Sequence, residues 1–229
     1  MDIEDCNNCK NWPKFPKHVS RATSGLLGNT VMICGGSMVD NFHLYHNLIT
    51  DECYSITSQK ATLVTHMSVE RVDAASIVLN DNTLWVTGGV GKDRLSLIST
   101  EYVKMSGSLP GPDLPIALDG HAMAAINSTV SMVIGGYDRS GLDGTESTFY
   151  YNHIEGVWSN GPILIQSRYY HAAGMVTDEL TNENFVSVTG GFWGYGMLQT
   201  GVYDSMVYLD SSEILQDGKW IEGKMNSIT

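Results

Sequence analysis

Short runs of apolar residues, separated by turn residues, recur along the whole chain. The clearest runs occupy residues 31–34, 84–87, 132–134 and 186–189, and they are rich in Val, Ile and Leu. Asn and Asp at residues 80–82 are typical of a tight hairpin before such a run. No segment of useful length has the 3.6-residue period of an amphipathic helix. The pattern therefore predicts an all-β chain of short antiparallel strands.

Each of these runs is followed by a pair of glycines, and the four pairs recur at intervals of about 50 residues. The regular spacing, with a similar strand before each pair, indicates an internal repeat. We expect an N-terminal tail at residues 1–11 and a repeat region at 12–229, with units at approximately 19–66, 67–115, 116–162 and 166–225. The paired glycines are Gly35, Gly36, Gly88, Gly89, Gly135, Gly136, Gly190 and Gly191.

Aromatic residues mark the second half of each unit. A tyrosine follows each glycine pair, and a tryptophan closes the third and fourth units. Each unit is therefore expected to form a sheet of four short antiparallel strands. One such sheet cannot bury both of its faces alone. Units of this kind pack face to face around an axis, as propeller blades do. The expected structural aromatics are Tyr54, Tyr102, Tyr150, Tyr208, Trp158 and Trp220.

The glycine pair after a hydrophobic strand, the later Tyr and Trp, and the Arg or His that opens the next unit together resemble the kelch repeat. The resemblance covers roughly residues 12–225 and implies a β-propeller of kelch type. In that family the glycines permit close approach of backbones, and Tyr and Trp pack between blades. Kelch propellers usually have five to seven blades, whereas this chain has about four. It is expected to form either an open or partial propeller that self-associates through its open ends, or a compact four-bladed ring.

Charge excludes two classes of partner. The chain has 13 basic and 25 acidic residues, a net charge of −12, so its surface repels phosphate backbones and anionic lipid. We therefore expect no nucleic-acid or membrane partner, and no run of apolar residues is long enough to span a bilayer. The acidic start at residues 1–5 lacks the apolar stretch of a signal peptide. A cytoplasmic location is favoured, although the sequon at residues 127–129 keeps secretion open if the true N-terminus is missing.

The cysteines and loop histidines do not predict a metal site. Cys6 and Cys9 have the spacing of half a zinc site, but no second pair completes it. His43 and His46 lie near acidic residues in a long loop, which is a weak pattern that a solvated loop explains better. Cys34 occupies a strand position and is expected to be a small core residue. With all four cysteines in the first quarter of the chain, a reducing compartment is the simpler expectation.

No catalytic motif is recognisable, so we expect a protein that is not an enzyme and needs no cofactor. His121 and His171 occupy one repeat position, which fits packing residues better than a catalytic pair. The chain has no nucleophile elbow, phosphate-binding loop or metalloprotease motif. It also lacks a legible Tyr, His and Cys set of the kind that the kelch-type copper oxidases use.

The loops at one end of the blades are the candidate binding site, because such turns gather around the channel of a propeller. Arginine and aromatic side chains in them are typical anchors of a binding surface. Two alternatives remain: the arginines could pair with carboxylates inside the blades, and the aromatics could fold back between blades. The candidate partner-binding residues are Arg21, Arg71, Arg168, Tyr137, Arg139, Phe192, Trp193 and Tyr195.

These features favour a non-catalytic protein-binding scaffold that recognises an acidic or aromatic-containing peptide on this face. The family resemblance implies one setting, the substrate-receptor module of a ubiquitin ligase, with the partner-docking half on another chain. The alternative is a secreted glycan-binding or sugar-modifying propeller, which the sequon and the low content of charged residues, 17%, favour.

Overall fold

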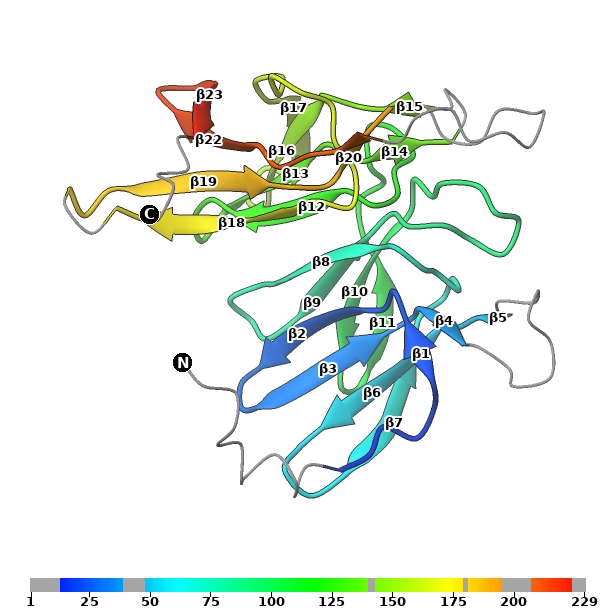
Figure 1. The fold of residues 1–229 in the computed structure, drawn as a ribbon. Coiled ribbons are helices and arrows are strands. Elements are labelled where there is room, and N and C mark those ends of the chain that lie inside the picture. The colour runs from blue at the N-terminus through cyan, green and yellow to red at the C-terminus, as the bar shows by residue number, and fades with distance from the viewer. Residues whose placement is uncertain (1–12, 39–47, 140–142, 179–180, 195–206, 224–229) are drawn as a thin grey trace, which may run out of the picture.

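The computed structural model describes residues 13–38, 48–139, 143–178, 181–194 and 207–223, and it contains strands and turns but no helix within them. Accordingly, no helix in these ranges could cross a membrane. The all-β prediction is confirmed. The described residues form four four-stranded sheets, together with short two- and three-stranded sheets (Figure 1).

We call the four-stranded sheets blades 1 to 4 in chain order; all neighbouring strands within them are antiparallel. Each blade lies inside one of the repeat units expected from the sequence. Blade 1 contains β2 (Thr23–Leu27), β3 (Thr30–Cys34), β6 (Glu52–Ile56) and β7 (Ala61–His66). Blade 2 contains β8 (Ala75–Val78), β9 (Leu84–Thr87), β10 (Thr100–Lys104) and β11 (Gly107–Pro110).

The second half of the chain repeats this arrangement. Blade 3 contains β12 (Ala122–Ala125), β13 (Val130–Ile134), β16 (Thr148–Asn152) and β17 (Val157–Asn160). Blade 4 contains β18 (Ala172–Thr177), β19 (Asn184–Thr189), β22 (Ser212–Gln216) and β23 (Lys219–Gly223). The first strands of the blades contact one another in the order β2, β8, β12 and β18, so the blades follow one another in an arc (Figure 1).

Short extra strands extend the connections at one end of the blades. Each lies just before a first strand or in the connection after a glycine pair, at the end of the blades that contains the glycine pairs. They are β1 (Val19–Ser20), β4 (Ser37–Met38), β5 (Leu48–Ile49), β14 (Tyr137–Asp138), β15 (Asp143–Gly144), β20 (Phe192–Trp193) and β21 (Val207–Tyr208).

The hydrophobic core consists of three clusters, one between each pair of successive blades. The first joins Met32 of blade 1 to Leu84 and Val86 of blade 2. The second contains Trp85 of blade 2, and the third contains Met132 of blade 3. All five side chains are fully buried, so the apolar faces of the blades are covered by their neighbours.

The first three glycine pairs lie where one blade approaches the next. The N–H of Gly36 donates to the carbonyl oxygen of Arg71 at 2.8 Å, and Gly136 donates to that of Arg168 at 2.9 Å. All eight paired glycines have positive φ. A Cβ at Gly135 would lie 2.6 Å from the Arg168 oxygen, so a larger residue cannot occupy that position without moving the next blade.

The repeat positions expected for the aromatic residues are correct only in part. Trp158 and Trp220 do occupy equivalent positions, opposite Tyr151 and Leu215 on the third strands. Tyr102 and Tyr150 are also equivalent, since they lie opposite Trp85 and Met132.

The expectation is wrong for the other two tyrosines. Tyr54 is one residue out of register, because Ser55 lies opposite Met32. Tyr208 belongs to the short strand β21, outside blade 4, and is 78% exposed. The connections between second and third strands differ in length, so spacing from the glycines does not preserve register.

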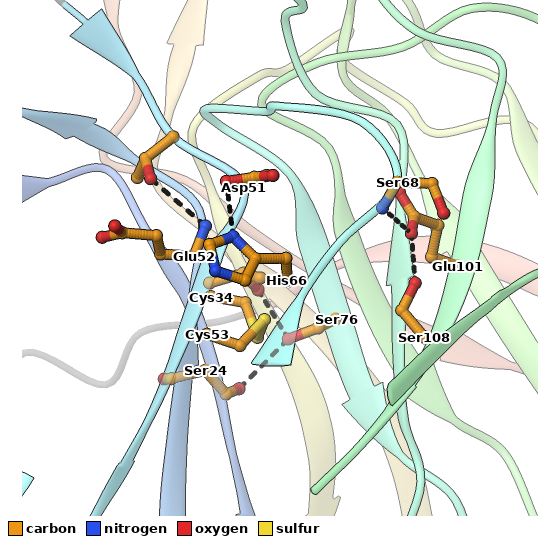
Figure 2. Close-up of a disulfide and its surroundings, with 12 residues drawn as sticks. Ser24, Cys34, Asp51, Glu52, Cys53, His66, Ser68, Ser76, Glu101 and Ser108 are labelled. Atoms are coloured by element: carbon orange, nitrogen blue, oxygen red, sulfur yellow. Dashed lines mark hydrogen bonds and ion pairs between the residues drawn. A yellow bond between two sulfur atoms is a disulfide. The ribbon is translucent and has the colours of Figure 1, made fainter. Parts of the chain in front are cut away.

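Cys34 is buried as expected, but it is not a free core residue. It forms a disulfide with Cys53, directly opposite it on β6, with a Cα–Cα distance of 4.1 Å (Figure 2). Both residues belong to the cluster between blades 1 and 2. The bond corrects the expectation of a reduced thiol. Cys6 and Cys9 lie outside the described residues, as do His43 and His46.

Replacing Gly135 with alanine should cost more than replacing Gly190. Both glycines have positive φ, 58° and 67°, so both variants carry similar backbone strain, about 1–2 kcal/mol. A Cβ at Gly190 would meet nothing closer than the Leu209 oxygen at 3.8 Å. We expect Gly135→Ala to lower the free energy of unfolding in urea by about 1–3 kcal/mol more than Gly190→Ala. Equal losses in the two variants would contradict the role of the close approach.

Candidate binding surface

The connection into each blade passes through one residue with a left-handed backbone, two positions before the first strand. These residues are Arg21, Asp73, Gly120 and Tyr170, with φ of 59°, 57°, 59° and 53°. Their backbones form a chain of hydrogen bonds. Asp73 donates to Arg21 at 3.1 Å, Gly120 to Asp73 at 3.0 Å, and Tyr170 to Gly120 at 2.7 Å. We call these four residues the axial row.

The side chains of the axial row bind one another. Nε of Arg21 donates to Oδ1 of Asp73 at 2.6 Å, and Nη2 of Arg21 pairs with Oδ2 of Asp73. The hydroxyl of Tyr170 donates to Oδ2 of Asp73 at 2.7 Å and accepts from Arg21 at 3.2 Å. Gly120 makes room for this contact, because a Cβ there would lie 3.0 Å from the Tyr170 ring. Three non-glycine residues in this strained conformation are typical of a functional site.

The charges of the row favour a neutral phenol between an arginine and a carboxylate. Burial, and then the charge of Asp73, raises the pKa of Tyr170 well above its usual value. The hydrogen bond to Asp73 raises the pKa of Arg21 as well. Tyr170 therefore remains a hydrogen-bond donor throughout the physiological pH range.

A second ion pair lies beside the row. Asp119 is fully buried and accepts hydrogen bonds from Oγ of Ser96 at 2.7 Å and Nε of Arg139 at 2.9 Å. The guanidinium of Arg139 also lies over the Tyr137 ring, 5.8 Å from its centre. Burial raises the pKa of Asp119. Arg139 keeps about a third of its side chain exposed, 32%, so it can still contact a partner.

Aromatic rings continue from the row toward solvent. The ring of Phe192 lies 5.8 Å from Tyr169, 6.2 Å from Tyr170 and 4.7 Å from Tyr208. Tyr169 is buried, and its ring centre lies 5.2 Å from that of Tyr137. The outer members are solvent-accessible, with Tyr170 at 41%, Trp193 at 45% and Tyr208 at 78% exposure. We call the contacting rings of Tyr170, Phe192 and Tyr208, together with Trp193, the next residue of β20, the aromatic surface.

Two of the predicted binding residues are internal. Arg71 and Arg168 are 1% and 0% exposed, so the expectation that they contact a partner is wrong. Arg71 donates to the carbonyl oxygen of Gly88 at 2.8 Å and to Glu101 at 2.7 Å. Arg168 makes the equivalent bonds to Gly190 and Glu213, both at 2.8 Å. The alternative, that these arginines serve carboxylates within the blades, is the correct one.

Tyr137, Arg139, Phe192 and Trp193 lie together at the end of the blades where they were expected, and Tyr195 is outside the described residues. Arg21 is also there, but it is not equivalent to Arg71. It is two residues further along the repeat.

Sequence reasoning missed Asp73, Asp119 and Tyr170. The signal that could have found Asp73 and Tyr170 is the constant two-residue distance to the first strand of each blade.

The two repeat histidines are packing residues. Nε2 of His121 lies 2.8 Å from the Thr87 hydroxyl. Ile134 occupies the position of Thr87 in blade 3, and neither ring nitrogen of His171 has a hydrogen-bond partner among the described residues. Burial lowers the pKa of each histidine to about 3. In the parts of the chain that the structure describes, no three His, Cys, Asp or Glu residues gather as metal ligands would.

Comparison with known proteins supports the fold and nothing finer. No protein-family model matches the chain, and no curated protein matches it either. A solved structure of YjhT is similar with a TM-score of 0.77 and 14% sequence identity. The match covers 94% of this chain and 74% of that one. At this identity the likeness concerns the backbone alone, and it agrees with a propeller-like arrangement of four-stranded sheets.

The buried histidines should make the fold acid-sensitive. Their pKa of about 3 in the folded chain lies below the usual 6.5, so the unfolded chain binds more protons. Their stabilising effect is complete above pH 6.5 and is lost as the pH falls towards 3. Between pH 6.5 and 5 we expect the free energy of unfolding to fall by about 3 kcal/mol from the two together. Urea denaturation at several pH values measures this.

The matched variant is His121→Ala with His171→Ala, because Ala22 and Ala74 occupy the same position in blades 1 and 2. It should flatten the pH dependence above pH 5, where most carboxylates remain ionised. An unchanged slope in this variant would show that the acid sensitivity comes from other groups.

Proposed function

We propose that the chain is an open kelch-type β-propeller. It binds a partner protein or peptide and does not catalyse a reaction. The observation that carries the proposal is the aromatic surface next to the strained axial row. Partly exposed aromatic side chains beside arginines are the common composition of a binding hot spot. The glycine pairs that join successive blades support the kelch assignment.

The ion pairs of Arg21 and Arg139 indicate which side chains a partner would present. Arg21 and Arg139 already neutralise Asp73 and Asp119, so an acidic group must share them with these carboxylates. Covering the exposed rings contributes more binding free energy, because a partner that buries this apolar surface breaks no existing ion pair. We therefore assign the main contact to aromatic or apolar side chains of the peptide, with an acidic residue directed at Arg21.

The disulfide bears on the setting in which the chain acts. Cullin-based substrate receptors act in the cytosol, where structural disulfides are rare. The buried Cys34–Cys53 bond therefore weighs against a ubiquitin-ligase receptor. The same bond favours the second candidate function, a secreted propeller that binds or modifies glycans, since aromatic rings also stack on sugars.

Trp193 should be an anchor of the binding surface. Peptides selected on the whole protein from a displayed random library, in parallel with a glycan array, supply the ligands. We expect Trp193→Ala and Tyr208→Ala each to weaken the selected peptides about 30-fold, since an anchor contributes about 2 kcal/mol. Titration calorimetry measures the affinity.

The control is Ile154→Ala. Ile154 lies in the turn between β16 and β17, and it is 78% exposed, as Tyr208 is. This variant should bind like wild type. If the surface variants keep full affinity while folded, the binding site lies elsewhere. If only glycans bind, and binding is lost in the same variants, the second candidate replaces the first.

A further inference from the structure

We propose that Asn127 carries an N-linked glycan. Asn127-Ser128-Thr129 is the only Asn-x-Ser/Thr triplet in the chain. It forms the turn between β12 and β13 of blade 3, and both Asn127 and Ser128 are exposed. The modification is independent of what the aromatic surface binds.

The local geometry presents the amide nitrogen to solvent. Oδ1 of Asn127 accepts three hydrogen bonds, from the N–H of Thr129 at 2.8 Å, its hydroxyl at 3.0 Å and the N–H of Val130 at 2.9 Å. With the oxygen held by the turn, Nδ2 is on the opposite side of the amide. Hydrogen bonds to the oxygen also draw electron density from the nitrogen and make its N–H more acidic. The hydroxyl of Thr129 is thus part of the reactive arrangement.

The transfer is a substitution at the first sugar carbon of a lipid diphosphate-linked oligosaccharide. The bond between Nδ2 of Asn127 and C1 forms while the bond from C1 to the diphosphate oxygen breaks. Nδ2 gives up one proton, the lipid diphosphate leaves with the electron pair, and the diphosphate or solvent takes up the proton. No oxidant or reductant takes part.

A second, independent observation places the chain where such donors are found. Cys34 and Cys53 form a buried disulfide, and such bonds form and persist in the secretory pathway (Figure 2). The sequon and the disulfide are in different blades and share no contact that could make one depend on the other. Both point to the same compartment.

The folded protein can accommodate the glycan without blocking its binding surface. β12 begins next to Gly120 of the axial row and ends at this turn, so the two lie at opposite ends of the blade. From blade 2, Nδ2 of Asn80 donates to the carbonyl oxygen of Ser128 at 3.2 Å. A glycan on Asn127 would therefore cover the far ends of blades 2 and 3.

The test is the state of Asn127 in protein isolated from its natural source. Peptide mapping before and after peptide N-glycosidase should show a glycan on this residue and then aspartate at position 127. Finding the unmodified asparagine throughout would overturn the proposal.

A variant series identifies the determinant. The full chain is secreted from eukaryotic cells behind a cleavable leader, and its intact mass is compared with and without the glycosidase. Asn127→Gln and Thr129→Ala should lose the mass shift completely, whereas Thr129→Ser, which keeps the hydroxyl, should retain it. Circular dichroism and the intact disulfide confirm that each variant is folded. A folded wild-type protein secreted without glycan would also refute the proposal.

Discussion

Backbone hydrogen bonds between successive blades are the constraint on which the rest of the structure depends. The second glycine of each of the first three pairs donates to the carbonyl oxygen four residues before the next first strand, at 2.8–2.9 Å. The axial row adds a second chain of such bonds at the same end. Backbones this close leave no room for a side chain, which is why glycine recurs at these positions. The same contacts hold Arg21, Asp73 and Tyr170 together and so form the candidate site.

Next to these backbone contacts, equivalent buried positions hold charged side chains in some blades and apolar side chains in another. Blades 2 and 4 use the ion pairs Arg71–Glu101 and Arg168–Glu213, whereas blade 3 has Leu118 and Phe149 there. Glu101 also accepts hydrogen bonds from Ser68 N–H at 2.6 Å and Ser108 Oγ at 2.5 Å (Figure 2). The residue equivalent to Ser68 in blade 3 is Pro115, which has no N–H to satisfy. Glu101 accepts from two backbone N–H groups, those of Ser68 and Val69, and the first of these donors is absent in blade 3.

The sequence predicted what depends on local pattern and missed what depends on distant partners. Short strands, glycine pairs and the paired Trp158 and Trp220 follow from spacing within one unit. The burial of Arg71 does not, because its carboxylate is 30 residues away and no local feature identifies it. The Cys34–Cys53 bond was missed for the same reason, since the two cysteines are 19 residues apart in the sequence.

The axial row shows a subtler limit. Arg21, Asp73, Gly120 and Tyr170 share a backbone conformation but no side-chain type, so comparison of residue identities could not align them. The arginine near the start of each unit suggests a different correspondence, between Arg21 and Arg71, which the backbone conformations do not support. The clustering of Tyr137, Arg139, Phe192 and Trp193 was predictable, because every connection after a glycine pair must emerge at the same end of its blade.

The central claim is that Arg71 is an internal residue that stabilises blade 2 through Gly88 and Glu101 and does not contact a partner. The most direct test transplants the blade 3 solution into blade 2, as Ser68→Pro, Arg71→Leu and Glu101→Phe, and compares it with Glu101→Phe alone. The single change should lower the free energy of unfolding by about 3–5 kcal/mol, because it leaves a buried arginine unpaired. The triple variant should recover more than half of that loss and bind ligands of the aromatic surface like wild type. A triple variant as unstable as the single one, or folded but unable to bind, would contradict this account.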